Sequence, residues 1–128
     1  MQGLLIKSND EIYMKDFEEP LYESIRNTLN GFFEIVRLNH NTTFIEMLGR
    51  KDFVLLVNDE GLLNNFSTNY VCSCLYKGAI AGDAILMKEG EVYGEPDIIG
   101  ITKEEAQHFL TVAKAYISTL LFQDYKEV

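Results

Sequence analysis

The clearest pattern along the chain is one unbroken apolar run, Phe-Val-Leu-Leu-Val at residues 53–57. Strands that are covered on both faces read as continuous hydrophobic runs, whereas strands with one wet face alternate. Asn58, Asp59, Glu60 and Gly61 follow directly and have the composition of a tight turn. We therefore expect residues 53–57 to form a strand in the middle of a sheet.

Shorter apolar stretches bounded by Gly, Asn and Asp predict further strands. They lie at residues 3–8, 11–15, 32–38, 83–87 and 97–101. Lys88, Glu89 and Gly90 are expected to turn the chain after the fourth of these, at residues 83–87. In residues 32–38, the alternation places Phe33 and Ile35 on one face and Glu34 and Val36 on the other, and it does not decide which face is buried.

Two segments have the spacing of helices. Residues 20–30 begin with Pro, which suits the first helical position, and repeat apolar residues every four positions. Residues 103–121 follow a capping box formed by Thr102 and Glu105. Their apolar stripe comprises Ala106, Phe109, Leu110, Ala113, Ile117, Leu120 and Leu121. Residues 43–48 and 70–76 could each form a strand or a helix, because the spacing of their apolar residues does not distinguish the two.

These elements predict an α+β fold in which a mixed, mainly antiparallel sheet of about five strands is covered by two helices. The length of 128 residues and the absence of a Ser- or Gly-rich linker predict a single domain spanning residues 1–128. Exposed sheet edges also favour pairing with another copy, so we expect that the chain can form a homodimer.

The amino-acid composition argues against some classes of partner. Eleven Lys and Arg stand against twenty Asp and Glu, giving a formal net charge of −9, which argues against nucleic acid as a partner. No apolar run approaches the ~18 residues of a membrane span, and the N-terminus lacks the features of a signal peptide, so we expect a cytoplasmic protein with no membrane partner. Cys72 and Cys74 are then reduced, and without a second ligand pair they predict neither a metal site nor a cofactor.

Polar residues concentrate after the predicted central strand. The candidate ligand-binding residues are Asn58, Asp59, Glu60, Asn64, Asn69, Asp83 and Glu34. Asn and Asp also bond to their own backbone in turns, so a purely structural role remains the competing interpretation. The functional interpretation is a pocket with an amide-rich rim that takes a polar small molecule or a peptide.

Three blocks occur in an order that resembles a known family. They are residues 29–36 (Leu-Asn-Gly-Phe-Phe-Glu-Ile-Val), residues 56–63 (Leu-Val-Asn-Asp-Glu-Gly-Leu-Leu) with Asn69 downstream, and residues 80–86 (Ile-Ala-Gly-Asp-Ala-Ile-Leu). Over roughly residues 4–110 the chain resembles domain of unknown function 3846 (DUF3846), found in small proteins of bacteria, phages and plasmids. The resemblance implies a small cytoplasmic α+β protein carried on mobile elements, and it implies no activity.

The sequence thus favours a non-catalytic binding or interaction module, whose acidic surface would match a basic surface on an unknown protein partner. The alternative is a small-molecule-binding protein or a hydrolase that uses the Asn-, Glu- and Asp-rimmed pocket, with Glu34, Asn58, Glu60 or Asp83 at work. No catalytic residue is assigned. A nucleic-acid binder would instead need its basic residues on one face: Arg26, Arg37, Arg50, Lys51 and Lys77.

Overall fold

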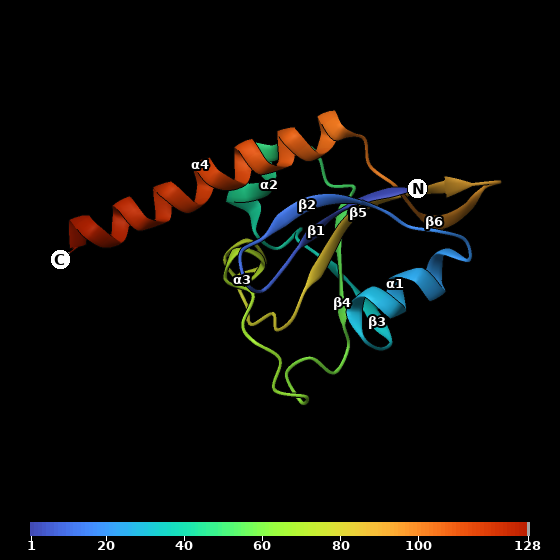
Figure 1. Ribbon diagram of the computed structural model, residues 1–128. Coiled ribbons are helices and arrows are strands. Elements are labelled where there is room, and N and C mark those ends of the chain that lie inside the picture. The colour runs from blue at the N-terminus through green and yellow to red at the C-terminus, as the bar shows by residue number, and fades with distance from the viewer. Residues whose placement is uncertain (128) are drawn as a thin grey trace.

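The computed structural model describes the backbone of residues 1–127 and the side chains of residues 1–120. Its centre is one antiparallel sheet (Figure 1). The strands are β1 (Gln2–Ile6), β2 (Ile12–Asp16), β3 (Phe33–Arg37), β4 (Phe53–Asn58), β5 (Ala84–Val92) and β6 (Glu95–Ile99). Their order is β2-β1-β5-β4-β3, and β6 pairs with the outer half of β5. The predicted α+β class is confirmed, and every pairing in the sheet is antiparallel.

The expected buried strand is β4, which lies between β5 and β3. All six of its residues are buried, as its unbroken apolar run predicts. Its side chains alternate between the two faces: Phe53, Leu55 and Val57 join one hydrophobic core, and Val54 and Leu56 join the other. β4 therefore connects the two cores of the molecule.

Within residues 1–127, four helices cover the sheet, so the expectation of two is wrong. They are α1 (Leu21–Leu29), α2 (Thr42–Leu48), α3 (Tyr70–Tyr76) and α4 (Lys103–Glu127). The two additional helices, α2 and α3, form at the two segments for which the spacing of apolar residues left strand and helix open. Both are set by side-chain caps, because Asn41 accepts a hydrogen bond from the Phe44 N–H and Asn69 accepts one from the Cys72 N–H.

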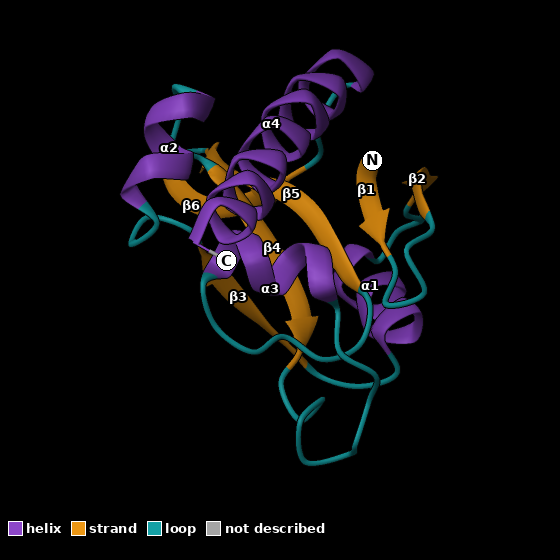
Figure 2. Ribbon diagram, turned by 90° about the vertical axis from the view of Figure 1, so that its left-hand side faces the viewer, coloured by secondary structure: helices purple, strands orange, loops and turns teal. Residues whose placement is uncertain are grey.

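The helices divide unevenly between the two faces of the sheet (Figure 2). Residues of α2, α3 and α4 share one core with β4, including Phe44, Leu75 and Phe109. On the opposite face α1 packs alone, through Ile25 and Leu29. One helix of nine residues leaves part of that face, including Phe33 and Ile35 of β3, only partly covered.

Most of the predicted stripe of α4 meets the sheet face as expected. Ala106, Phe109 and Ala113 are buried, and Leu110, Ile117 and Leu120 pack against the same core. Tyr116 is also buried, although the stripe did not include it. The side chain of Leu121 lies outside the described residues. No helix in residues 1–127 combines the length and apolarity needed to cross a membrane.

The turn expected at residues 88–90 is wrong. β5 continues through these residues to Val92, and the chain turns at Tyr93 and Gly94, which have φ of 52° and 78°. Gly90 serves packing instead, because a Cβ built there would lie 2.6 Å from the Ile99 Cδ1 atom of the paired strand. The hairpin of β5 and β6 therefore projects beyond the rest of the sheet (Figure 1).

Candidate functional site

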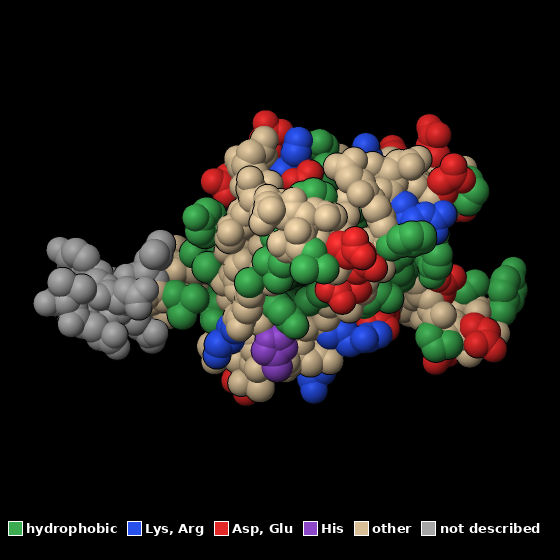
Figure 3. Space-filling view, turned by 90° about the horizontal axis from the view of Figure 1, so that it is seen from below, with side chains coloured by type: hydrophobic (Ala, Val, Ile, Leu, Met, Phe, Trp, Pro, Cys, Tyr) green, Lys and Arg blue, Asp and Glu red, His purple; other side chains and the backbone are tan. Residues whose placement is uncertain are grey.

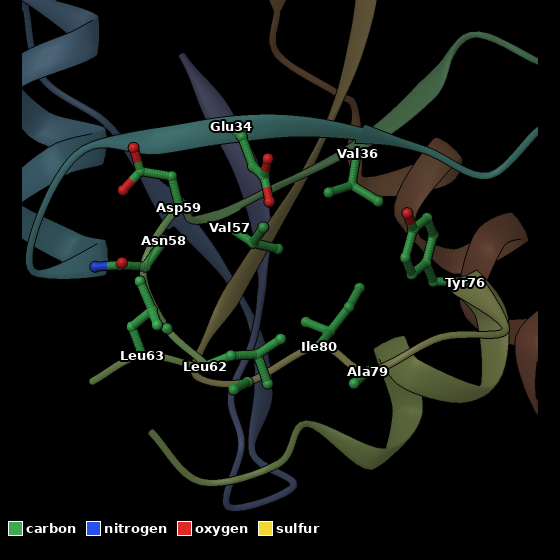
Figure 4. A pocket seen from close by; sticks show the side chains of 12 residues that line it. Glu34, Val36, Val57, Asn58, Asp59, Leu62, Leu63, Tyr76, Ala79 and Ile80 are labelled. Atoms are coloured by element: carbon green, nitrogen blue, oxygen red, sulfur yellow. The ribbon is translucent and has the colours of Figure 1, made fainter. Parts of the chain in front are cut away.

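A cavity of about 380 Å³ opens between the edge of the sheet and the loops at the end of β4. We call it the Glu34 cavity. It is lined by Glu34, Val36, Val57, Asn58, Asp59, Gly61, Leu62, Leu63, Tyr76, Ala79, Ile80 and Ala81. β3 forms its roof, the loop after β4 forms one wall, and the end of α3 forms the other (Figure 4). Its volume lies within the usual range of small-ligand sites.

The charged side chains that line the cavity are both acidic. Glu34 extends from β3 toward the interior of the cavity (Figure 4), and Asp59 stands where β4 ends. The remaining side chains of the lining are aliphatic apart from the Asn58 amide and the Tyr76 phenol, and no Lys, Arg or His is among them within the described residues. Two carboxylates beside apolar walls attract a cation that also carries hydrocarbon.

Leu62 and Leu63 form an exposed apolar rim at the mouth of the cavity. They are 64% and 80% exposed, although their neighbour Gly61 is buried. A Cβ at Gly61 would lie 2.6 Å from the Ala81 carbonyl oxygen, so the close approach of the two segments requires glycine. The Phe66 N–H donates to the Gly61 carbonyl at 3.0 Å and closes the loop, which holds both leucines outward.

From the side on which this loop lies, hydrophobic side chains gather around a group of Asp and Glu side chains (Figure 3). The exposed Leu62 and Leu63 side chains follow Asp59 and Glu60 in the loop after β4. Apolar surface and negative charge therefore lie close together at the mouth of the cavity.

Asn58 and Asn69, which the sequence selects as candidate ligands, hold the fold together instead. The Asn58 amide donates to the Leu29 carbonyl at 2.9 Å, and its oxygen accepts from the Glu60 N–H at 2.8 Å. The Asn69 amide donates to the carbonyls of Ile6 and Gly82 at 2.9 and 3.0 Å. Both side chains are buried and use their hydrogen-bonding groups internally.

The other candidates are dispersed. Glu60 and Asn64 are exposed on the loop after β4 and do not line the cavity. Asp83 lies before β5 and accepts a hydrogen bond from the Ser8 N–H at 3.0 Å. Of the seven predicted residues, the structure therefore brings Glu34, Asn58 and Asp59 together.

Sequence reasoning missed two kinds of residue. The apolar lining of the cavity, such as Val36, Ile80 and Tyr76, reads as ordinary core in the sequence. Asn41 is not among the residues selected from the sequence, yet it is 1% exposed and its amide donates to the Leu75 carbonyl at 2.8 Å. Its signal was available, because Asn41 precedes Phe44 by the three residues typical of a helix cap.

The strongest group of charges lies away from the cavity, between α4 and the sheet. Glu105 forms ion pairs with Arg50 at 2.7 Å and Lys88 at 2.9 Å. Burial opposes ionisation of Glu105, but hydrogen bonds from the Thr102 N–H, Lys88 and Arg50 outweigh burial and lower the pKa of this carboxyl. A hydrogen bond from Arg50 likewise lowers the pKa of Asp52, against the effect of burial. These charges fasten α4 to the sheet.

Two of the basic residues named from the sequence are paired with carboxylates. Arg50 is committed to Asp52 and Glu105, and Arg37 is paired with Glu89 at 2.7 Å. Burial raises the pKa of the Cys72 thiol to about 12, so this cysteine is a core residue rather than a nucleophile. Within the described residues, no group of three or more His, Cys, Asp or Glu side chains is placed to hold a metal ion.

Comparison with known proteins defines the fold alone. No protein-family model matches the chain, and no curated protein sequence matches it. Among solved structures, the crystal structure of the small RNA methyltransferase HEN1 is similar to 86% of this chain, with a TM-score of 0.54 and 15% sequence identity. The chain spans 16% of that protein's length, so the similarity shows that the two share a fold over one part of the larger protein.

Proposed function

We propose that the protein is a non-catalytic binding module, and that the Glu34 cavity receives a positively charged group on an apolar stem. One observation carries the proposal: Glu34 and Asp59 line a mainly apolar cavity that contains no basic residue within the described part of the chain. A lysine or arginine side chain matches it, because its methylene stem packs on hydrocarbon while its charged head stays near the carboxylates.

The charge of the whole molecule supports the same partner. A net charge of −9 attracts a basic partner over a longer range than the cavity itself, and increases the association rate at low salt. Exposed Leu62 and Leu63 then supply apolar contact at the rim. We place this interaction in the cytoplasm, and we retain the relationship to DUF3846 as part of the proposal.

The alternative small-molecule site or hydrolase has less support. Of the residues expected to do such work, Asn58 is occupied by the Leu29 carbonyl and the Glu60 N–H, and Glu60 and Asp83 do not line the cavity. Glu34 is then the one member of the expected set that points into the cavity with a free carboxylate among the described contacts. The residues expected for a hydrolase are therefore dispersed, which supports binding over catalysis.

The experiment is an NMR titration of the whole chain with N-acetyl-lysine methylamide. The matched probe is N-acetyl-norleucine methylamide, which keeps the stem and lacks the charge. At about −0.3 kcal/mol per non-hydrogen atom, a probe of this size binds with a dissociation constant of ~1 mM. We expect saturable shifts at Val36, Val57 and Ile80 with the lysine probe alone, and weaker shifts as salt rises.

Two variants localise the effect. Glu34→Gln removes the carboxylate in the cavity, whereas Glu46→Gln removes an exposed carboxylate on α2 and serves as the control. Glu34→Gln should abolish the preference for the lysine probe, and Glu46→Gln should leave it unchanged. Equal binding of both probes to the unmodified protein, or no binding at the cavity, would overturn the proposal.

A further inference from the structure

The outer edge of β3 carries backbone groups that the sheet does not use. The Asp59 N–H donates to the Phe32 carbonyl at 3.0 Å, so these two residues form a hydrogen-bonded pair. Such pairs alternate along antiparallel strands, which makes Glu34–Val57 and Val36–Leu55 the next bonded pairs. The N–H and C=O groups of Phe33, Ile35 and Arg37 therefore point away from β4.

Among the described residues, β3 has little protection as an edge strand apart from the Glu34 carboxylate, which projects into the Glu34 cavity. β3 is the last strand of the sheet and contains neither proline nor glycine. Natural edge strands are often guarded by charged side chains, bulges or prolines that discourage further pairing. The Arg37 guanidinium does not guard it, because that group reaches back across the sheet to Glu89, 2.7 Å away.

Incompletely covered apolar surface flanks the edge on both faces. On one face is the Glu34 cavity, into which Glu34 and Val36 project. On the other face is a shallow concavity of about 430 Å³, lined by Tyr22, Arg26, Phe32, Phe33, Ile35, Arg37 and Ile98. Within it Phe32 is 72% exposed, and Phe33 and Ile35 are only partly buried. A strand added to β3 would cover both faces with alternate side chains.

We propose that the outer edge of β3 binds an extended peptide segment as an added antiparallel strand, with a basic side chain beside Glu34 and apolar side chains on the Phe33 and Ile35 face. Main-chain hydrogen bonds to residues 33, 35 and 37 supply affinity, and the alternate side chains supply specificity. The choice of a basic side chain rests on the proposed function, whereas the edge pairing rests on the backbone of β3.

Charge selects a basic peptide over a second copy of the chain as the occupant. In an antiparallel pairing of two β3 edges, the second copy would bring its own Glu34 carboxylate to the same face of the joined sheet. It would also add a net charge of −9 to a surface that is already acidic. Like charges across adjacent strands destabilise the pairing, whereas a lysine opposite Glu34 stabilises it.

The test uses the synthetic peptide acetyl-Thr-Leu-Lys-Leu-Thr-amide and two N-methylated versions of it, titrated into the whole chain by calorimetry. In an antiparallel pairing with Lys beside Glu34, the leucine N–H groups face β3 and the lysine N–H faces solvent. N-methylation of the second leucine should weaken binding about tenfold, and N-methylation of lysine should have little effect. Equal binding of all three peptides would overturn the edge pairing.

The protein variants separate this inference from the proposed function. Glu34→Gln should weaken the lysine peptide but leave the contrast between the two N-methylated peptides intact. If Glu34→Gln has no effect while the contrast persists, the edge pairing stands and the cation site fails. If the contrast is absent while Glu34→Gln still weakens binding, the cation site stands and the edge pairing fails.

Sedimentation of the free protein gives the remaining outcome. Exposed sheet edges favour a homodimer, but the like charges on β3 oppose one at this edge, so we expect a monomer whose state does not change when the peptide binds. A dimer that dissociates on Ile35→Pro, a variant that removes one outward N–H group, would assign the edge to a second copy and overturn the peptide as its occupant. Because the peptide series uses the unmodified protein, the test does not depend on whether this variant folds.

Discussion

β4 and β3 are paired strands of the same sheet, yet they differ in almost every physical respect. All residues of β4 are buried, whereas β3 has one buried residue, Val36, and two exposed ones, Glu34 and Arg37. β4 fills both cores, and β3 leaves its outer backbone groups and part of both faces available. The comparison teaches that the interior strand of one sheet can supply its packing while the edge strand leaves backbone groups and side chains uncovered.

The largest expected effect comes from the interior strand. Leu55 is fully buried in β4, so Leu55→Ala should lower the free energy of unfolding by about 3 kcal/mol through lost burial and the remaining cavity. Ile35→Ala on β3 should cost about 1 kcal/mol, because Ile35 is only partly covered. Urea unfolding monitored by circular dichroism measures both values, and similar costs at the two sites would break the comparison.

Substitution of a buried asparagine should destabilise the protein, as substitution within β4 does, more than substitution of an exposed one. Asn69→Ala removes a helix cap and leaves the carbonyls of Ile6 and Gly82 without their donor, which should cost about 2 kcal/mol. Asn64→Ala, on the exposed loop, should change the free energy of unfolding by less than about 0.5 kcal/mol. If the two substitutions proved equivalent in thermal unfolding, the structural role of Asn69 would be refuted.

Glu105, which forms ion pairs, and Glu34, which is exposed on β3, allow the same comparison for charged residues. Glu105→Gln keeps the capping box but loses the ion pairs to Arg50 and Lys88, so it should cost about 1 kcal/mol at pH 7. Since folding lowers the pKa of Glu105, its contribution is present above the ordinary glutamate pKa and disappears as pH falls through the folded value. Denaturant unfolding of both proteins between pH 7 and pH 3 measures this convergence.

Glu34→Gln is the matched control for charge. Glu34 is exposed on β3, and the variant should unfold within about 0.5 kcal/mol of the unmodified protein at pH 7. A gap between unmodified protein and Glu105→Gln that persists unchanged at pH 3 would contradict the role assigned to the Glu105 ion pairs.

The sequence predicts the sheet well because its strongest signals are local. The apolar run of β4 and the capping box of Thr102 and Glu105 each specify an element from neighbouring residues, and the Glu105 N–H does donate to the Thr102 hydroxyl. The spacing of apolar residues in 70–76 could not distinguish a helix from a strand, because a helix of seven residues spans barely two turns. Asn69 was the informative residue there, as a cap rather than as a ligand.

The candidate site was only partly predictable, because a cavity depends on segments that are distant in sequence. Glu34 and Asp59 meet through the pairing of β3 with β4, which the sequence favours without fixing the register. Tyr76 and Ile80, which come later in the sequence than Glu34 and Asp59, complete the lining. The residues next to them in the sequence give no sign that they line a cavity. The abundance of Asn after β4 pointed to the right loop, although Asn58 uses its amide to hold that loop in place.

Hydrogen exchange at β3 tests the central claim most directly. In the free protein, the Glu34 and Val36 amides should be protected by β4, whereas the Ile35 amide should exchange readily. Saturating acetyl-Thr-Leu-Lys-Leu-Thr-amide should slow exchange at Ile35 by at least about tenfold and leave residues of β4 unchanged. An Ile35 amide that is already protected in the free monomer, or that exchanges just as fast with peptide bound, would contradict the account.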